Sequence, residues 1–428
     1  MASYLICSTP VRHHVTPMIQ IGAYLVSRGN RVIMITGSRF ADTIKRAGME
    51  FVAFEGRADI DDRDIPSYLP YRHRYRGLAR TQYDIQNIFV KTIPAQFRSV
   101  RDVMQREWID AVLVDGAFGG ISPVLLSKAP RPPILAIGVI TFTQLSRDAA
   151  PSGFAMAPSS TPLGRVRNRA LNILARSVLF RRTQRAAQEA LIEVGARKTS
   201  MFVMDISGAF DRLLQLGPVT LEYPRSDLSP NVRFIGALPT ENAAALPPWW
   251  SELDGSRAVV YVSQGTTDNR NFDRLITPTL AALASDDVLV VVSTGGRSVE
   301  SLGDVPSNAR VADALPYDRL LPLVDVVVTN GDYSEVLAAL AAGVPLVVAG
   351  GTEDKPEVAA RVQWSGAGID LRTGAPTADA VASAVRRVLG DERYRARARR
   401  FADELAQLDT LHIIEDELAE AIMMRSGR

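Results

Sequence analysis

The sequence is nearly free of cysteine. Cys7 is the only one in 428 residues, so an intrachain disulfide and a zinc site built from clustered cysteines are both excluded. We expect no metal and no cofactor. No apolar run approaches the roughly 20 residues that a membrane-spanning helix needs. The N-terminus has neither a basic leader nor a cleavage site and reads directly as a strand, so a cytoplasmic location is the simplest interpretation.

An excess of charge of either sign is also missing. The formal net charge is +2, which gives no general affinity for nucleic acid. Hydrophobic residues make up 46% of the chain and charged residues 22%, values typical of a soluble globular protein. The length exceeds one ordinary domain, so we expect two domains of about 200 residues each.

Buried strands alternate with helices in both halves of the chain. The strands predicted in the first half are Tyr4–Ser8, Arg31–Thr36, Glu50–Phe54, Ala111–Val114 and Ile134–Val139. Those predicted in the second half are Ala258–Ser263, Val288–Ser293, Ala309–Val311, Val326–Thr329 and Pro345–Ala349. Such alternation predicts doubly wound, mostly parallel sheets.

A stretch rich in Pro, Asn and Ala separates the two halves. We place the linker at residues 238–250, between an N-terminal domain at 1–237 and a C-terminal domain at 251–408. Residues 409–428 form a last helix that we expect to pack back on the first domain. Within the first domain we expect a mobile charged loop at 59–80 and a long helix at 82–105, kinked at Pro94.

Arginines alternate with apolar residues in one segment between Arg165 and Arg185. The arginines are Arg165, Arg167, Arg169, Arg176, Arg181, Arg182 and Arg185. This pattern predicts a basic amphipathic helix or helix pair. Two interpretations stay open: a solvated basic face over a packed apolar one, or peripheral contact with an anionic membrane surface or a lipid acceptor.

Two candidate catalytic residues follow predicted strands. His14 comes after the first strand, in the sequence His13-His14-Val15-Thr16-Pro17, and Asp115 ends a later one. The carboxyl ends of parallel strands are where α/β proteins bind ligands, so the two side chains can meet there. A carboxylate on one imidazole nitrogen fixes the tautomer and makes the other nitrogen a stronger base. The alternative is that His13 or His14 caps the following helix and Asp115 caps the helix that follows its own strand.

These motifs resemble the nucleotide-sugar glycosyltransferases of the GT-B fold, in family 1, which includes plant and bacterial UDP- or dTDP-sugar enzymes for natural products. The resemblance covers nearly the whole chain. It implies two Rossmann-like, doubly wound α/β domains that face a central cleft, with the acceptor bound by the first domain and the donor by the second. His14 matches the catalytic base of the family, Asp115 matches its partner, and His13 occupies the usual glycine position.

The resemblance also implies a set of donor-binding residues in the second domain. They are Gly265, Thr266, Thr267, Arg297, Pro316, Tyr317, Asn330, Gly331, Ser334, Asp354 and Lys355. Among them, Asp354 and Lys355 resemble the pair that holds the hydroxyls of the donor sugar. Arg297, Pro316 and Tyr317 resemble the loops around the nucleotide base.

The donor turn departs from the family pattern. Asn330 replaces a histidine, Asp332 replaces a glycine, and Glu335 stands where a hydroxyl is usual. From the residues alone, Asp332 to Glu335 forms a capping box, in which Asp332 accepts from the first helix amides and Glu335 reaches back. Each carboxylate close to a diphosphate costs about 1–4 kcal/mol of repulsion. The alternative is an ordinary cap that points away from the ligand.

The sequence therefore predicts an inverting glycosyltransferase that moves a sugar from a UDP- or dTDP-sugar to a hydroxyl group. The acceptor is a hydrophobic natural product, such as a polyketide or macrolide, or a lipid, bound near residues 59–80 and 138–153. The resemblance implies that no metal is required. Two alternatives stay open: a glycosyltransferase-like protein that has lost nucleotide-sugar use and does His/Asp acid-base chemistry, and a non-catalytic auxiliary binding protein.

Overall fold

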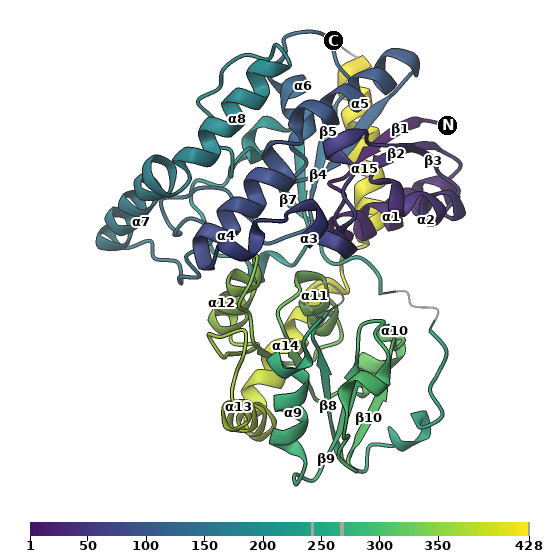
Figure 1. Cartoon of the computed structure of the whole chain (residues 1–428), viewed down its shortest axis with the longest axis vertical. Coiled ribbons are helices and arrows are strands. Elements are labelled where there is room, and N and C mark those ends of the chain that lie inside the picture. Colours follow the sequence, from purple (N-terminus) through teal and green to yellow (C-terminus); the bar gives the residue numbers. More distant parts are fainter. Residues whose placement is uncertain (241–243, 266–268, 427–428) are drawn as a thin grey trace.

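The computed structural model describes residues 1–240, 244–265 and 269–426. In these residues the strands form two parallel sheets, one in each half of the chain, stacked along the long axis of the molecule (Figure 1). No helix among the described residues is both long enough and apolar enough to cross a membrane.

The first sheet has the strand order β3-β2-β1-β4-β5-β6-β7. Its strands are β1 (Ser3–Cys7), β2 (Arg31–Thr36), β3 (Glu50–Ala53), β4 (Ala111–Asp115), β5 (Ile134–Gly138), β6 (Arg212–Gln215) and β7 (Val232–Phe234). From β1 successive strands are added toward one edge of the sheet, and from β4 toward the other. The position between β1 and β4 is therefore the topological switch point, where doubly wound folds bind ligands.

The second sheet repeats this arrangement with the order β10-β9-β8-β11-β12-β13. Its strands are β8 (Ala258–Ser263), β9 (Val288–Ser293), β10 (Ala309–Ala312), β11 (Val326–Thr329), β12 (Leu346–Val348) and β13 (Gly368–Asp370). The switch point falls between β8 and β11, whose register pairs Thr329 with Ser263.

Helices cover both sheets. Those of the first half are α1 (Arg12–Ser27), α2 (Ala41–Arg46), α3 (Ile65–Tyr68), α4 (Gly77–Asp84), α5 (Ile93–Arg106), α6 (Ser122–Leu126), α7 (Pro162–Leu174) and α8 (Arg181–Glu193). Those of the second half are α9 (Ile276–Leu283), α10 (Tyr317–Leu320), α11 (Tyr333–Ala341), α12 (Lys355–Ser365), α13 (Ala378–Gly390), α14 (Glu392–Leu405) and α15 (Thr410–Ser426). Because helices lie on both faces, the central strands β1, β4, β5, β8, β9 and β11 are buried and mostly apolar.

The sequence prediction of the first domain was wrong in two helical regions. The expected helix at 82–105 is broken: α4 passes into a π-helical stretch, Ile85–Val90, and α5 begins afresh at Ile93. Pro94 lies in the first turn of α5, where its missing N–H costs no helix hydrogen bond. The expected loop at 59–80 contains α3 and the start of α4.

Three strands were not predicted. β6, β7 and β13 have only three or four residues each. β7 lies within residues 226–250, the stretch rich in Pro, Asn and Ala whose lack of periodicity predicts no strand. The remaining strands agree with the predicted runs to within a residue or two at each end.

The last helix, α15, lies against the first sheet although it follows the second in sequence (Figure 1). The Tyr24 hydroxyl donates to Glu415 at 3.0 Å, and Arg233 pairs with Glu417 at 2.6 Å. The chain therefore crosses between its halves twice. The division into an acceptor domain and a donor domain is a functional statement and stays a prediction.

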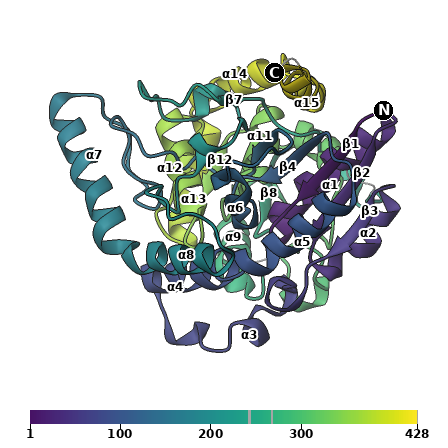
Figure 2. The same ribbon diagram turned by 90° about the horizontal axis from the view of Figure 1, so that it is seen from above.

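The segment from α7 to α8 lies at the periphery of the first half, and α7 forms the edge of the molecule seen from above (Figure 2). Between α7 and α8 the helix widens into a π-helical stretch, Ala175–Leu179.

Candidate functional site

His14 and Asp115 meet at the switch point of the first sheet. The Nδ1 atom of His14, in the first turn of α1, lies 3.0 Å from Oδ1 of Asp115, the last residue of β4. The two side chains are 2% and 0% exposed. Their meeting follows from topology, because β1 and β4 are neighbours in the sheet.

Backbone amides hold the Asp115 carboxylate in place. It accepts from the Thr9 N–H at 2.6 Å and from the Ala117 N–H at 2.9 Å. Burial alone would raise the pKa of Asp115, but attraction to His14 and these hydrogen bonds hold it below its ordinary value. The alternative that Asp115 caps the helical segment after it is wrong, because the N-cap of that segment is Phe118 and has no side-chain hydrogen bond among the described residues. The Asp115 carboxylate instead holds its own turn while it contacts His14.

The alternative prediction for the histidines is wrong. Helix α1 begins after Val11, and no side chain among the described residues caps it. A carboxylate facing Nδ1 favours the tautomer with the proton on that nitrogen, which leaves Nε2 as the basic one. The arrangement can therefore accept a proton at Nε2.

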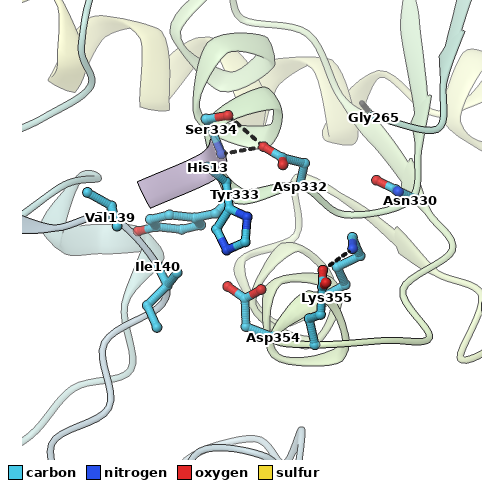
Figure 3. A pocket seen from close by; sticks show the side chains of 11 residues that line it. His13, Val139, Ile140, Gly265, Asn330, Asp332, Tyr333, Ser334, Asp354 and Lys355 are labelled. Atoms are coloured by element: carbon cyan, nitrogen blue, oxygen red, sulfur yellow. Dashed lines mark hydrogen bonds and ion pairs between the residues drawn. The ribbon is translucent and has the colours of Figure 1, made fainter. Parts of the chain in front are cut away.

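A pocket lies between the carboxyl ends of the two sheets. It is lined by residues that follow β1, β5, β8, β11 and β12: His13, Val139, Ile140, Gly265, Asn330, Asp332, Tyr333, Ser334, Glu353, Asp354 and Lys355 (Figure 3). Residues from both halves of the chain contribute, so the pocket depends on how the halves are held together.

His13 faces this pocket and was not predicted as a site residue. Its ring lies 4.5 Å from that of His14. Burial lowers the pKa of His13 to about 4; repulsion from His14 adds to this, and Glu353 and Asp332 oppose it. Both acids come from the second half of the chain. Sequence reasoning passed over His13 because the family has glycine there.

The donor turn between β11 and α11 is shaped by Asp332 and Gly331. The Asp332 carboxylate accepts from the amides of Ser334 at 3.1 Å and Glu335 at 3.3 Å, so it caps α11 as predicted. Gly331 has φ +90°, and a Cβ there would lie 3.0 Å from Val348 Cγ1. Only glycine tolerates both the positive φ and the close approach of Val348.

The Glu335 carboxylate does not accept from the backbone N–H of Asp332, so the second half of the predicted capping box is wrong. It instead accepts from Thr329 Oγ1 at 2.5 Å and from the Tyr317 hydroxyl at 3.1 Å, beneath the turn. Burial raises the pKa of Glu335 to about 7. Of the two acids in the turn, Asp332 lines the pocket, whereas Glu335 does not.

The acidic pair after β12 also lines the pocket. The Lys355 ammonium lies 2.5 Å from Glu353, whose backbone has φ +58°. Burial and the neighbouring Glu353 charge raise the pKa of Asp354 to about 6. Lys355 and Asn330 also line a second, adjoining pocket that extends past Gly351 and Thr373.

The amide nitrogen of Asn330 makes a hydrogen bond within the protein. Its Nδ2 donates to the Gln264 carbonyl at 2.7 Å. That bond ties the turn after β11 to the loop after β8, across the switch point of the second sheet.

Of the other predicted donor residues, only Gly265 lines this pocket among those that the structure describes. Gly265 lines the pocket with φ +69°. Thr266 and Thr267 lie outside the described residues. In the part of the chain that the structure describes, Arg297, Pro316 and Tyr317 do not line this pocket. The Tyr317 hydroxyl lies 2.7 Å from that of Tyr261 and, with Glu335, belongs to the buried polar cluster beneath the turn.

A buried ion network joins the halves beside the pocket. Arg361 on α12 is 2% exposed and makes paired bonds of 2.8 and 2.9 Å to Glu222, which follows β6. It also contacts Glu357 at 2.7 Å. Glu357 in turn accepts from the amides of Gly153 and Ala155 in the first half.

The chain is similar to known proteins over most of its length. Residues 277–419 match the family described as erythromycin biosynthesis protein CIII-like, C-terminal domain. The chain is 36% identical to the 4'-demethylrebeccamycin synthase of Lentzea aerocolonigenes, over 96% of this chain and 97% of that protein. It is 35% identical to UDP-glycosyltransferase 2 of Phaeomoniella chlamydospora, over 97% and 95%.

Solved structures share the fold. The calicheamicin glycosyltransferase CalG4 superposes with a TM-score of 0.73 at 20% identity, covering 99% of this chain and 98% of that one. The glycosyltransferase of kitacinnamycin also gives a TM-score of 0.73, with 98% of each chain covered.

Proposed function

This chain belongs to the family 1 natural-product glycosyltransferases of the GT-B fold, and on that premise we propose an inverting transfer of a sugar from a UDP- or dTDP-sugar to the hydroxyl of a hydrophobic small molecule. His14 is the base and Asp115 holds it. The observation that carries this proposal is the buried His14–Asp115 contact at the switch point of the first sheet.

In the proposed reaction, Nε2 of His14 takes the proton of the acceptor hydroxyl as its oxygen attacks the anomeric carbon. The bond from that carbon to the diphosphate oxygen breaks on the opposite side, so the configuration inverts and the nucleoside diphosphate leaves. Asp115 stabilises the imidazolium that forms. No metal is needed in this scheme, because backbone amides and cationic side chains can oppose the charge of the leaving group.

The donor is proposed to bind on the side of the pocket formed by the second half. The residues proposed to bind it follow β11 and β12, at the carboxyl ends of these strands: Asn330, Gly331, Ser334, Asp354 and Lys355. Asp354 and Lys355, which line the pocket, are proposed to contact the sugar hydroxyls. Gly265 would flank the donor; Thr266 and Thr267, which the resemblance also implies as donor-binding, lie outside the described residues. Arg297, Pro316 and Tyr317 have weaker support, since they lie away from the described pocket.

The acceptor is proposed to bind on the side formed by the first half. Val139 and Ile140 give this side an apolar surface next to His13. An apolar wall suits a hydrophobic natural product or a lipid. The comparisons favour neither a protein that has lost nucleotide-sugar use nor a non-catalytic auxiliary binding protein, since two relatives matched over nearly their full length are named UDP-glycosyltransferase and UDP-glucosyltransferase.

The test is transfer by the purified chain with panels of UDP- and dTDP-sugars and hydrophobic aglycones, followed by mass spectrometry. We expect a product heavier by one sugar and an inverted anomeric centre by NMR. Replacement of the base, His14→Ala, should lower kcat by about 10²–10⁴-fold. Absence of any product, together with no binding of UDP or dTDP at millimolar concentration, would overturn the proposal.

The neighbouring histidine supplies a matched control. His13→Ala removes an imidazole from the same turn, 4.5 Å away, without removing the contact to Asp115. We expect it to retain far more activity than His14→Ala. If His13→Ala were the more damaging change, the assignment of the base would be wrong.

A further inference from the structure

Helix α7 is amphipathic in the reverse sense: its polar side chains face the protein. Asn168 is fully buried, and its amide donates to the carbonyls of Arg147 and Ser159. Asn172 donates to the carbonyl of Ser146, and Arg165 pairs with Asp148 at 2.8 Å. The inward face is therefore fixed by hydrogen bonds rather than by apolar packing.

The outward face of the same helix is apolar. Leu163 is 83% exposed, Val166 68% and Ile173 57%, and Leu174 is exposed beside them. The spacing of three, seven and one residues places them on one side of an α-helix. Val178, in the π-helical stretch that follows, is 63% exposed. The prediction of a packed apolar face under a solvated basic one is thus wrong for α7.

The segment that carries this face, residues 149–188, holds charged side chains of one sign only. No aspartate or glutamate occurs from residue 149 to residue 188, although seven arginines do. Five of these arginines are exposed: Arg169, Arg176, Arg181, Arg182 and Arg185. An exposed apolar face flanked by arginine is the arrangement of a helix that lies in the interface of an anionic bilayer.

We propose that α7 docks on the surface of a bilayer that contains anionic lipid, with Leu163, Val166 and Ile173 entering between the headgroups and the exposed arginines contacting lipid phosphates. The peripheral position of α7 leaves this face unobstructed by the rest of the fold (Figure 2). This inference does not rest on the proposed sugar transfer. If the acceptor is lipid-soluble, docking would bring the enzyme to it.

Charge argues against a second copy of the chain as the occupant. A symmetric dimer through α7 would bring the same basic segment of both copies together. The segment offers no carboxylate to offset the repulsion between them. An anionic lipid surface supplies the opposite charge along the whole face.

The test is flotation of the full chain with vesicles of phosphatidylcholine alone and of phosphatidylcholine with phosphatidylglycerol. We expect partition onto the anionic vesicles, weakening as salt is raised. Leu163→Asp with Val166→Asp should lower partition by at least about tenfold. Arg169→Glu with Arg176→Glu should lower it by at least about tenfold as well.

The control places two aspartates on another exposed apolar pair. Met423 and Met424, on α15, are 66% and 50% exposed. Met423→Asp with Met424→Asp should leave partition unchanged. Circular dichroism and the thermal midpoint of each variant report whether the fold is retained.

Three results would overturn the proposal. The first is no partition onto anionic vesicles, and the second is equal partition by the α7 variants and the chain itself. The third is a dimer, seen by sedimentation without vesicles, that dissociates when Leu163 and Val166 become aspartate, since the occupant would then be a second copy. Each result stands whether or not sugar transfer is found.

Discussion

Asp332 is the carboxylate of the donor turn that a diphosphate would meet. It lines the pocket and caps α11 at the same time. Asp332→Asn keeps an oxygen for the cap and removes the charge. We therefore expect UDP or dTDP to bind at least about fivefold more tightly to this variant by calorimetry, because one repulsive pair of about 1–4 kcal/mol is lost.

Glu335→Gln is the matched control for that charge. Glu335 points beneath the turn to Thr329 and Tyr317, so removal of its charge should change nucleotide affinity little. If Glu335→Gln strengthened binding as much as Asp332→Asn, the repulsion would not be local to the pocket. If neither did, charge would not limit donor binding.

Glu335 also makes stability depend on pH. Burial raises its pKa from 4.5 to about 7 in the folded chain. The folded state then binds more protons than the unfolded state between these values, so this acid lowers stability as pH rises through that window. Between pH 4.5 and 8, the native chain should lose about 1–3 kcal/mol more of its free energy of unfolding than Glu335→Gln does.

Urea unfolding at several pH values measures this difference. The pH dependence that the two chains share, from groups such as Asp354, cancels in the comparison. Parallel stability curves for the native chain and Glu335→Gln would show that Glu335 is ionised at little cost.

At the scale of elements, the β11–α11 turn depends on a close approach of backbone and side chain. A Cβ on Gly331 would lie 3.0 Å from Val348 and 3.3 Å from the carbonyl of Lys355, at φ +90°. Gly331→Ala should therefore cost about 1–3 kcal/mol of stability. It should also weaken donor binding, since Lys355 must shift with the turn.

Gly390→Ala is the control for this substitution. Gly390 ends α13, and a Cβ there meets no atom within 4 Å. The change should be neutral or slightly stabilising, because alanine loses less chain entropy on folding. Equal thermal midpoints for Gly331→Ala and the native chain would show that the turn relaxes without cost.

At the scale of the whole molecule, Arg361 joins the two halves at the pocket. Its guanidinium pairs with Glu222 of the first half and Glu357 of its own helix, and all three are buried. Arg361→Met would leave two buried carboxylates without this cation. We expect a loss of about 3–5 kcal/mol in urea unfolding, and a higher KM for the donor, because α12 begins at Lys355.

Arg393→Met tests whether any lost arginine has this effect. Arg393 is 88% exposed and pairs with Asp391 in its own turn. Its replacement should change stability by less than about 0.5 kcal/mol. Adding Glu222→Gln to Arg361→Met should recover part of the loss; no recovery would mean that the unpaired charge is not the cause.

Most strands could be predicted, because a strand buried on both faces must be apolar along its length. β8, β9 and β11 agree with the predicted runs residue for residue. β6, β7 and β13 could not be found in this way, since three or four residues with polar members among them carry too little pattern. Each is fixed in the sheet by pairing with a neighbouring strand: β6 with β5, β7 with β6, and β13 with β12.

Some features of the candidate site could likewise be predicted from the sequence, and others could not. The contact of His14 with Asp115 could be expected, because each follows a strand and strand order places those ends together. The direction of Glu335 could not, since a carboxylate at that position can reach either the cap or the buried hydroxyls. His13 was missed because the family has glycine at that position, and the pocket that His13 faces is completed only by the second half of the chain.

The sequence alone determined two parallel sheets, the location of ligand-binding turns at the ends of their strands, and the kinship with glycosyltransferases. Those properties follow from local apolar runs and from motifs contiguous in the chain. Tertiary structure decided which acid of the turn lines the pocket, which histidine faces that pocket, and that α7 turns its apolar side outward. These depend on contacts between residues far apart in sequence, whose hydrogen bonds and burial outweigh local preference.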